Sequence, residues 1–248
     1  MTSHPEPELL ILADDPHELP NPHKALHEPE GLAAIGGDLT PKRLLNMYQH
    51  GFFPWFSEQD PILWWHPAER CVIAPEAFHC NRSLRKAVKR GNWQWRINGN
   101  FPTVIRTCAA LRAHEEGTWI VPEIEQAYTR LHKLGYAFSV ETYLDGELAG
   151  GFYGVAMGQQ FYGESMFSLK PNGSKIALGQ FCALCPELGI RLIDCQVESE
   201  HLLTLGAKLM PRPEFVDVLK RHVPMQTPNL ALQKLALNHE LMPVTFAL

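Results

Sequence analysis

The segment from residue 137 to residue 166, AFSVETYLDGELAGGFYGVAMGQQFYGESM, decides the fold class. Residues 137–144 alternate between apolar and polar side chains, which predicts a β-strand, and the Asp145-Gly146 pair that follows is a typical hairpin turn. Residues 148–157 are expected to form the return strand, and residues 159–166 a further strand. The segment therefore predicts consecutive antiparallel strands.

The chain beyond this segment predicts helices around one more strand. Residues 174–188 have the length and apolar spacing of a helix, which Gly189 is suited to end. Residues 191–197 are expected to form a short buried strand, and helices are expected at residues 198–206 and 213–222. Antiparallel strands followed by helix, strand and helix predict an α/β, or α+β, domain with a mixed sheet.

The N-terminal part of the chain differs in charge and in proline content. The first 40 residues hold eight acids, one base and six prolines, which indicates an extended acidic segment that leads into a small domain. Thr40 and Pro41 are residue types that begin a helix, and Gly51 is suited to end it. We expect a small N-terminal domain over residues 1–68 and a second domain over residues 69–248.

Composition excludes several classes of protein. The chain has 248 residues, of which 45% are hydrophobic, so it is too apolar to be disordered and long enough to fold without a metal or a disulfide. Its longest uncharged apolar stretch, residues 148–163, is too short and too rich in glycine to span a membrane. No export signal is visible, so we expect a cytoplasmic protein in which Cys182 and Cys185 are reduced core thiols.

Basic residues gather in one part of a chain that is acidic as a whole. The formal net charge is −5, which by itself argues against a nucleic-acid partner, yet residues 77–114 contain eight bases and no acid. Placed on a helix at about 100° per residue, five of the bases fall within an arc of about 140°. They are Arg82, Arg85, Lys86, Lys89 and Arg90.

This basic arc favours a polyanion as partner. Like charges four residues apart on a helix repel by roughly 0.2–0.5 kcal/mol per pair, and a polyanion removes that repulsion. Leu84 and Val88 fall on the opposite side, where they can face the core, and Gly91 ends the helix. A solvated surface helix is the alternative interpretation.

Three polar residues in apolar surroundings form the candidate site. Glu164 lies at the end of an otherwise uncharged strand, and Asp194 and Gln196 lie two apart within the apolar residues 192–197. Alternation along a strand places Asp194 and Gln196 on one face of the sheet. A buried polar group without a partner costs on the order of 1–3 kcal/mol. The three residues are therefore either a satisfied core network or a site in which Asp194 orients Gln196 and Glu164 receives a cation.

Six separated motifs resemble those of one enzyme family. They are Gly36-Gly37-Asp38-Leu39, Gly51-Phe52-Phe53-Pro54-Trp55-Phe56, Trp64-Trp65, Glu116-Gly117-Thr118-Trp119-Ile120, Gly163-Glu164-Ser165-Met166-Phe167 and Ile193-Asp194-Cys195-Gln196. From about residue 26 to about residue 220 the chain resembles the bacterial leucyl/phenylalanyl-tRNA–protein transferases. This resemblance implies an acetyltransferase-like C-terminal domain. It also implies transfer of Leu, Phe or Met from aminoacyl-tRNA to the N-terminal Arg or Lys of a protein, which marks that protein for degradation.

The resemblance also implies roles for individual residues. Asp194 and Gln196 match the pair that activates the acceptor α-amine, and Glu164 matches a carboxylate suited either to the cationic acceptor or to a proton relay. Residues 82–90 match the tRNA-binding cluster. The substrate-binding residues that the resemblance implies are Trp55 and Trp119 for the terminal adenosine and Phe152, Phe161, Met166, Leu178, Phe181 and Ile193 for the transferred side chain. No metal or cofactor is expected, and the protein is expected to be a monomer.

Two functions of other classes stay open. An acyltransferase that uses an acyl-CoA donor needs a phosphate-binding loop, but residues 160–165 lack the final small residue of that pattern and place Glu164 where the phosphates would bind. An RNA-binding module without catalysis predicts that Asp194→Ala leaves RNA binding intact and has no functional effect.

Overall fold

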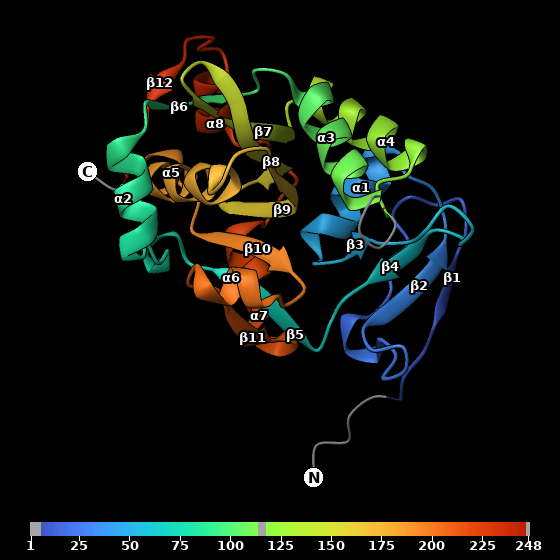
Figure 1. The fold of residues 1–248 in the computed structure, drawn as a ribbon. Helices are drawn as coiled ribbons and strands as arrows, with labels where there is room; N and C mark the ends of the chain where they lie inside the picture. Colours follow the sequence, from blue (N-terminus) through green and yellow to red (C-terminus); the bar gives the residue numbers. More distant parts are fainter. Residues whose placement is uncertain (1–5, 114–117, 247–248) are drawn as a thin grey trace.

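The computed structural model describes residues 6–113 and 118–246, which form two β-sheets flanked by helices (Figure 1). The smaller sheet has the strand order β1, β2, β4, β3. Its strands are β1 Leu10–Leu12, β2 Leu32–Gly36, β4 Leu63–Trp65 and β3 Phe53–Pro54. Helix α1, Pro41–Gln49, begins after Thr40, whose side chain accepts a hydrogen bond from the backbone N–H of Arg43. The predicted helix start is confirmed.

The larger sheet has the strand order β11, β5, β10, β9, β8, β7, β6, β12 in the described part of the chain. Its strands are β5 Glu69–Ile73, β6 Trp93–Ile97, β7 Ala137–Leu144, β8 Glu147–Met157, β9 Gln160–Ser168, β10 Leu192–Gln196, β11 Lys208–Pro211 and β12 Met242–Pro243. Strand β10 runs parallel to β9, whereas the other pairs are antiparallel. The predicted α+β class with a mixed sheet is confirmed.

Helices cover both faces of the larger sheet. They are α2 Arg82–Arg90, α3 Phe101–Ala113, α4 Pro122–Lys133, α5 Gly173–Leu188, α6 Glu200–Thr204, α7 Arg212–His222 and α8 Leu230–Leu235, with short 3-10 helices at Pro22–Lys24 and Pro75–Ala77. Side chains along β8 alternate between two apolar cores, so Tyr153 faces the core with α3 and α4, whereas Phe152 faces the core with α5.

Most of the predicted elements are present at nearly the predicted bounds. Strands β7, β8, β9 and β10 and helices α5 and α7 confirm the predictions for residues 137–222, and Gly189 follows α5 with φ 67°. The helix predicted at residues 198–206 is shorter, Glu200–Thr204, because Ser199 accepts from the N–H of Leu202 and begins it there. The sequence predicted no element between residues 93 and 133, where the structure has β6, α3 and α4.

The chain passes from the smaller sheet to the larger one at the expected boundary between the domains. The last strand of the smaller sheet to appear in the chain, β4, ends at Trp65, and the first strand of the larger sheet, β5, begins at Glu69. The division into domains over residues 1–68 and 69–248 remains a proposal that fits this change of sheet.

Candidate functional site

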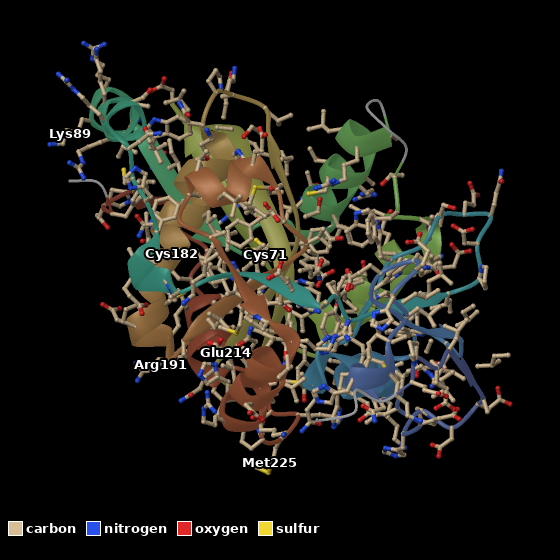
Figure 2. All side chains as sticks on the ribbon, turned by 90° about the horizontal axis from the view of Figure 1, so that it is seen from below. Cys71, Lys89, Cys182, Arg191, Glu214 and Met225 are labelled. Atoms are coloured by element: carbon tan, nitrogen blue, oxygen red, sulfur yellow. The ribbon has the colours of Figure 1, made fainter. Side chains whose placement is uncertain are left out.

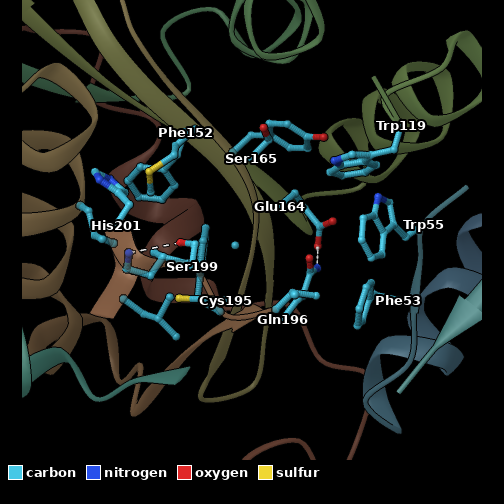
Figure 3. Close-up of a pocket in the computed structure, with 18 of the residues that line it drawn as sticks. Phe53, Trp55, Trp119, Phe152, Glu164, Ser165, Cys195, Gln196, Ser199 and His201 are labelled. Carbon is cyan, nitrogen blue, oxygen red and sulfur yellow. Dashed lines mark hydrogen bonds between the residues drawn. The ribbon is translucent and has the colours of Figure 1, made fainter. Parts of the chain in front are cut away.

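A cavity of about 390 Å³ lies where the smaller sheet meets the larger one. Figure 3 shows Phe53, Trp55 and Trp119 along one side of it and Phe152 and His201 along the other, with Glu164 and Gln196 between the two sides. Trp55 follows β3 and is 43% exposed, so its ring stands at the mouth of the cavity. Both tryptophans that the resemblance assigned to the terminal adenosine therefore line one cavity. The Glu116-Gly117 part of the motif around Trp119 lies outside the described residues.

The apolar side of the cavity contains five of the six side chains expected there. They are Phe152, Phe161, Met166, Leu178 and Ile193. Phe181 is fully buried and does not line the cavity, because it packs behind it with ring centroids 5.5 Å from Phe152 and 4.6 Å from Phe161. Phe181 therefore does not line the cavity, contrary to the expectation. It supports the side chains that form the wall.

Glu164 is placed by an irregularity in β9. Across the β8–β9 ladder Tyr153 pairs with Ser165 and Gly154 pairs with Gly163, so Glu164 is an extra residue in a β-bulge. Its carboxylate accepts hydrogen bonds from the hydroxyl of Tyr48 at 2.7 Å, from the hydroxyl of Tyr128 at 3.0 Å and from the amide of Gln196 at 3.0 Å. The two tyrosine hydroxyl oxygens also contact each other, so the two phenols and the carboxylate form one hydrogen-bond network.

The surroundings of Glu164 change its acidity. Burial raises the pKa of the Glu164 carboxyl to about 7 from 4.5, although the three hydrogen bonds that it accepts lower it. A carboxyl with a pKa near 7 exchanges a proton easily at neutral pH, which suits it to acid–base chemistry. Burial and the nearby Glu164 raise the pKa values of Tyr48 and Tyr128 well above 10, so both phenols remain donors.

Gln196 is also placed by a bulge. Strand β10 pairs with β9 only as far as Asp194 opposite Tyr162, and its register against β5 shifts between Asp194 and Gln196. Gln196 has φ 65°, a left-handed conformation that is uncommon for residues other than glycine. Its backbone N–H donates to Oδ1 of Asp194 at 2.8 Å, which holds this conformation in place. Beyond Tyr162 the two strands separate, and Gln196 reaches Glu164 across the gap.

Asp194 does not line the cavity. It is fully buried and forms a two-point ion pair with Arg70, with the Arg70 Nε at 2.8 Å and the second nitrogen at 2.7 Å. The prediction that Asp194 and Gln196 share one face of the sheet is wrong, because the bulge breaks the alternation between them. Asp194 touches Gln196 through the backbone N–H, so it is placed to orient that residue.

Several residues of this site were not predicted from the sequence. Arg70, Tyr48 and Tyr128 hold Asp194 and Glu164, and Tyr153 lines the cavity. A base next to the apolar residues 71–73 was the available signal for Arg70, because a charge in a buried strand needs a partner. The tyrosines gave no comparable signal, since their positions on α1, α4 and β8 are those of ordinary core residues.

The basic arc lies on α2 as predicted. All five of its bases are exposed, whereas Leu84 and Val88 are buried, and no ion pair within the described residues involves any of the five. Figure 2 shows the side chain of Lys89 extending away from the body of the protein. Figure 1 shows α2 and the helices α3 and α4 at opposite sides of the molecule, so the arc and the tryptophan side of the cavity are far apart. His114, at the end of the acid-free window, lies outside the described residues.

A second hollow, of about 400 Å³, adjoins the first and has a different character. It shares Phe53, Trp55 and Val197 with the first cavity. Its other lining residues include three carboxylates, from Glu30, Glu69 and Glu198. The mouth of the cavity beside Trp55 is therefore acidic.

The cysteines are free thiols. Cys182 and Cys185 are buried in α5, so the prediction that they are core thiols is confirmed, and Figure 2 shows Cys182 within the body of the protein. Among residues 6–113 and 118–246 no group of three or more His, Cys, Asp or Glu side chains is arranged to hold a metal ion. None of the helices in those ranges combines the length and the hydropathy needed to cross a membrane.

Comparison with known proteins gives consistent similarities along the chain. The family model described as leucyl/phenylalanyl-tRNA protein transferase matches residues 72–220, and the model of its N-terminal domain matches residues 37–68. The leucyl/phenylalanyl-tRNA–protein transferase of Idiomarina loihiensis is 52% identical over 84% of this chain and 89% of its own. The one from Pseudomonas entomophila is 48% identical over 87% of this chain and 95% of its own.

Solved structures are more distant. A functionally unknown conserved protein from Staphylococcus epidermidis is 12% identical, with a TM-score of 0.40 over 58% of this chain and 57% of its own. A GCN5-related N-acetyltransferase from Sphaerobacter thermophilus is 14% identical, with a TM-score of 0.35 over 76% of this chain and 60% of its own.

Proposed function

The chain belongs to the leucyl/phenylalanyl-tRNA–protein transferase family, and on this premise we propose how its cavity carries out the transfer. The enzyme is an aminoacyltransferase that moves Leu or Phe from aminoacyl-tRNA to the N-terminal Arg or Lys of a protein, which marks that protein for degradation. The observation that carries the mechanism is the hydrogen bond between Gln196 and Glu164 at the centre of an aromatic cavity.

The donor lies across the cavity with its two ends on opposite sides. The terminal adenosine stacks between Trp55 and Trp119, because flat aromatic surfaces suit a nucleobase. The Leu or Phe side chain, or that of Met, fills the apolar side beside Phe152 and Phe161. The ester that joins these two ends then passes the Glu164–Gln196 pair, which Figure 3 shows between them.

The reaction is aminolysis of that ester. The neutral α-amine of the acceptor attacks the carbonyl carbon, and a C–N bond forms while the π electron pair moves to oxygen. When the C=O bond re-forms, the C–O bond to the ribose breaks, and one proton passes in all from the amine to the released ribose oxygen. Holding donor and acceptor together supplies up to roughly 7–11 kcal/mol of the lowering of the barrier.

Glu164 takes a proton from the amine and then gives one to the leaving ribose oxygen. Its pKa of about 7 leaves it partly ionised at neutral pH, so it can accept a proton from the amine and give one to the leaving oxygen. Gln196 orients the amine: its Nε2 donates to Glu164, which leaves its Oε1 to accept an N–H from the acceptor. Asp194 is a positioning residue, because it fixes the backbone of Gln196 and lies outside the cavity.

The acceptor approaches through the acidic hollow. Its N-terminal Arg or Lys carries a positive side chain, and Glu69 and Glu198 are exposed carboxylates beside the cavity mouth. Opposite charges in a partly enclosed hollow attract more strongly than on an open surface, because less water screens them. The body of the tRNA contacts the basic arc on α2, and the five bases there neutralise its phosphates.

The test combines the enzyme with Phe-tRNA and an Arg-initiated peptide, without ATP or acyl-CoA. Extension of the peptide by Phe supports the proposal, and its absence overturns it. Binding of coenzyme A in a calorimeter would favour the acyl-CoA alternative. An Asp194→Ala variant that still binds RNA and shows no functional defect would favour an RNA-binding module. We also propose that the enzyme acts as a monomer in the cytoplasm; light scattering on the purified protein tests the first part.

A further inference from the structure

The hydroxyl of Tyr153 is buried in the wall of the cavity and has no hydrogen-bond partner among the described residues. The side chain is 0% exposed, and the residue lines the cavity together with Glu164 and Ser165. A buried hydroxyl without a partner costs about 1–3 kcal/mol, and most native structures avoid that cost. An unpartnered hydroxyl at a cavity wall therefore points to a ligand atom that completes it.

The ring of Tyr153 is held firmly, so its hydroxyl has a fixed position. It packs edge-on against Phe101 and Tyr128, with ring centroids 5.8 Å and 5.7 Å away. Across the β8–β9 ladder Tyr153 lies opposite Ser165, the residue directly after the bulge at Glu164. Tyr153 is thus on the same wall of the cavity as Glu164, whose carboxylate we propose as the base.

The hydroxyl acts as a donor and not as a base. Burial, above all, raises the pKa of Tyr153 well above 10, and Glu164 and Cys108 raise it further, while Arg112 lowers it. Arg112 lines the same cavity and donates from Nε to the hydroxyl oxygen of Ser165 at 2.8 Å. A protonated phenol beside a guanidinium suits an oxygen that gains negative charge.

We propose that the Tyr153 hydroxyl donates a hydrogen bond to the carbonyl oxygen of the aminoacyl ester as that oxygen becomes an oxyanion. This inference rests on the proposed function. The ester lies between the tryptophan side and the apolar side of the cavity, and Tyr153 lines the same cavity on β8, paired with Ser165 of β9, the residue after Glu164. One N–H of the Gln196 amide is already bonded to Glu164, whereas the Tyr153 hydroxyl has no partner among the described residues, so Tyr153 is a free donor at this wall.

The hydroxyl makes and breaks no covalent bond in this role. When the amine attacks, the π electron pair of the carbonyl moves to its oxygen, and the O–H of Tyr153 shortens its contact to that oxygen without giving up the proton. When the carbonyl re-forms and the ribose oxygen leaves, the contact weakens again. A donor that acts mainly in the transition state raises kcat and changes substrate binding little.

The first test is Tyr153→Phe, which removes the hydroxyl and keeps the packed ring. We expect kcat for Phe transfer to an Arg-initiated peptide to fall about 100-fold, with KM for Phe-tRNA within about twofold, because loss of one oxyanion donor costs roughly 10²–10³ in kcat. The matched control is Tyr136→Phe, whose hydroxyl donates to the backbone oxygen of Gln226 at 3.0 Å, outside the cavity. The control should keep its kcat and lose thermal stability, whereas Tyr153→Phe should keep its melting temperature.

A second measurement uses two inert donor analogues that differ at the reacting carbon. One is an aminoacyl adenosine with a planar amide in place of the ester, and the other has a tetrahedral phosphonate with a charged oxygen. Tyr153→Phe should bind the amide as the unaltered enzyme does and bind the phosphonate at least tenfold more weakly. A kcat within threefold of the unaltered enzyme, or equal loss of affinity for both analogues, would overturn the role of Tyr153. If the unaltered enzyme transfers no Phe at all, it is the proposed function that fails.

Discussion

The side-chain amide of Gln196 donates a 3.0 Å hydrogen bond to the carboxylate of Glu164, although the two residues lie on different strands, 32 positions apart in the chain. Two bulges produce this contact, one at Glu164 in β9 and one before Gln196 in β10. Each bulge shifts its strand by one residue and turns a polar side chain toward the cavity. Because the parallel pairing ends at Asp194 and Tyr162, the strands part here and leave room for substrate.

The first prediction concerns the pH dependence of transfer. Glu164 must be ionised to accept a proton, and its pKa of about 7 means that the active form is lost as the pH falls below 7. The acceptor amine, with a pKa of roughly 7.7–8.0, must also be neutral. Well below pH 7 the logarithm of kcat/KM should therefore rise with pH at a slope of about two.

In Glu164→Gln only the acceptor amine titrates, so the slope should fall to about one and the rate should fall by roughly 10²–10⁴-fold. The control is Glu141→Gln, a carboxylate that is also buried in the larger sheet but lies outside the cavity. Glu141→Gln should keep the slope of about two. An unchanged profile in Glu164→Gln would show that Glu164 is not the base.

The second prediction separates the structural and positioning roles of Asp194. Asp194→Ala leaves the buried guanidinium of Arg70 without its anion, so the free energy of unfolding should fall by about 3–5 kcal/mol. Replacing both partners, Asp194→Leu with Arg70→Met, removes the buried charge and should restore much of that stability. Urea unfolding measures both effects.

The double variant should nevertheless transfer Phe slowly. Its residue 194 can no longer accept the hydrogen bond from the backbone N–H of Gln196, which holds Gln196 at φ 65°. We expect kcat to stay at least tenfold below that of the unaltered enzyme while the melting temperature recovers. Recovery of both quantities together would mean that Asp194 serves stability alone.

The sequence predicted what depends on local patterns. The alternation in residues 137–144 and the spacing of Leu84 and Val88 identified β7 and α2, because each element buries one face of its own segment. The resemblance likewise identified residues that share one cavity, from Trp55 to Gln196. Their roles are still proposals.

What the sequence could not predict depends on contacts between distant segments. The hydroxyl of Tyr48 reaches Glu164 across 116 positions, and Arg70 reaches Asp194 across 124. The bulge before Gln196 cannot be recognised from the sequence, since the apolar and polar residues of 192–197 alternate as they would in a regular strand. Asp194 was therefore expected beside Gln196 on one face, whereas the structure turns them apart. Phe181 has the same apolar character as Leu178, and only the packing of α5 shows which of the two lines the cavity.

The third prediction concerns the basic arc on α2. Changing Arg85, Lys86 and Lys89 to Ala should weaken binding of Phe-tRNA and reduce the salt slope of its binding constant by up to about 0.9 per lost phosphate contact. The free energy of unfolding of this variant should change by less than about 0.5 kcal/mol, because all three side chains are exposed and none forms an ion pair within the described residues.

Two controls test whether the effect is specific to α2 and to the body of the tRNA. Arg130→Ala with Lys133→Ala removes two exposed bases from α4, on the other side of the molecule, and should leave the slope unchanged. A short donor, Phe esterified to adenosine, lacks the tRNA body and should react equally well with the α2 variant. An unaltered salt slope in the α2 variant would remove the arc from the tRNA-binding surface.

The fourth prediction tests the acidic hollow as the entrance for the acceptor. Glu69→Gln with Glu198→Gln should raise KM for an Arg-initiated peptide several-fold at low salt, and the difference should shrink as salt screens the charges. KM for Phe-tRNA should not change. Glu187→Gln with Glu214→Gln removes the same charge from exposed positions outside both hollows and serves as the control. Equal effects of the two double variants would mean that net charge matters and position does not.

The last prediction distinguishes the wall of the side-chain pocket from its support. Phe152 lines the cavity, so Phe152→Ala should enlarge it, and Leu-tRNA should lose more activity than Phe-tRNA because the smaller side chain no longer fills the space. Pocket contacts of this size change discrimination by roughly 10–200-fold, so in competition the ratio of the kcat/KM values should shift toward Phe by at least about tenfold.

Phe181→Ala instead opens a void behind the wall and should lower the free energy of unfolding by about 3–5 kcal/mol, with a much smaller shift in donor preference. Phe152→Met keeps a side chain of similar volume at the wall and should stay close to the unaltered enzyme in both respects. A larger shift of preference in Phe181→Ala than in Phe152→Ala would reverse the assignment of wall and support.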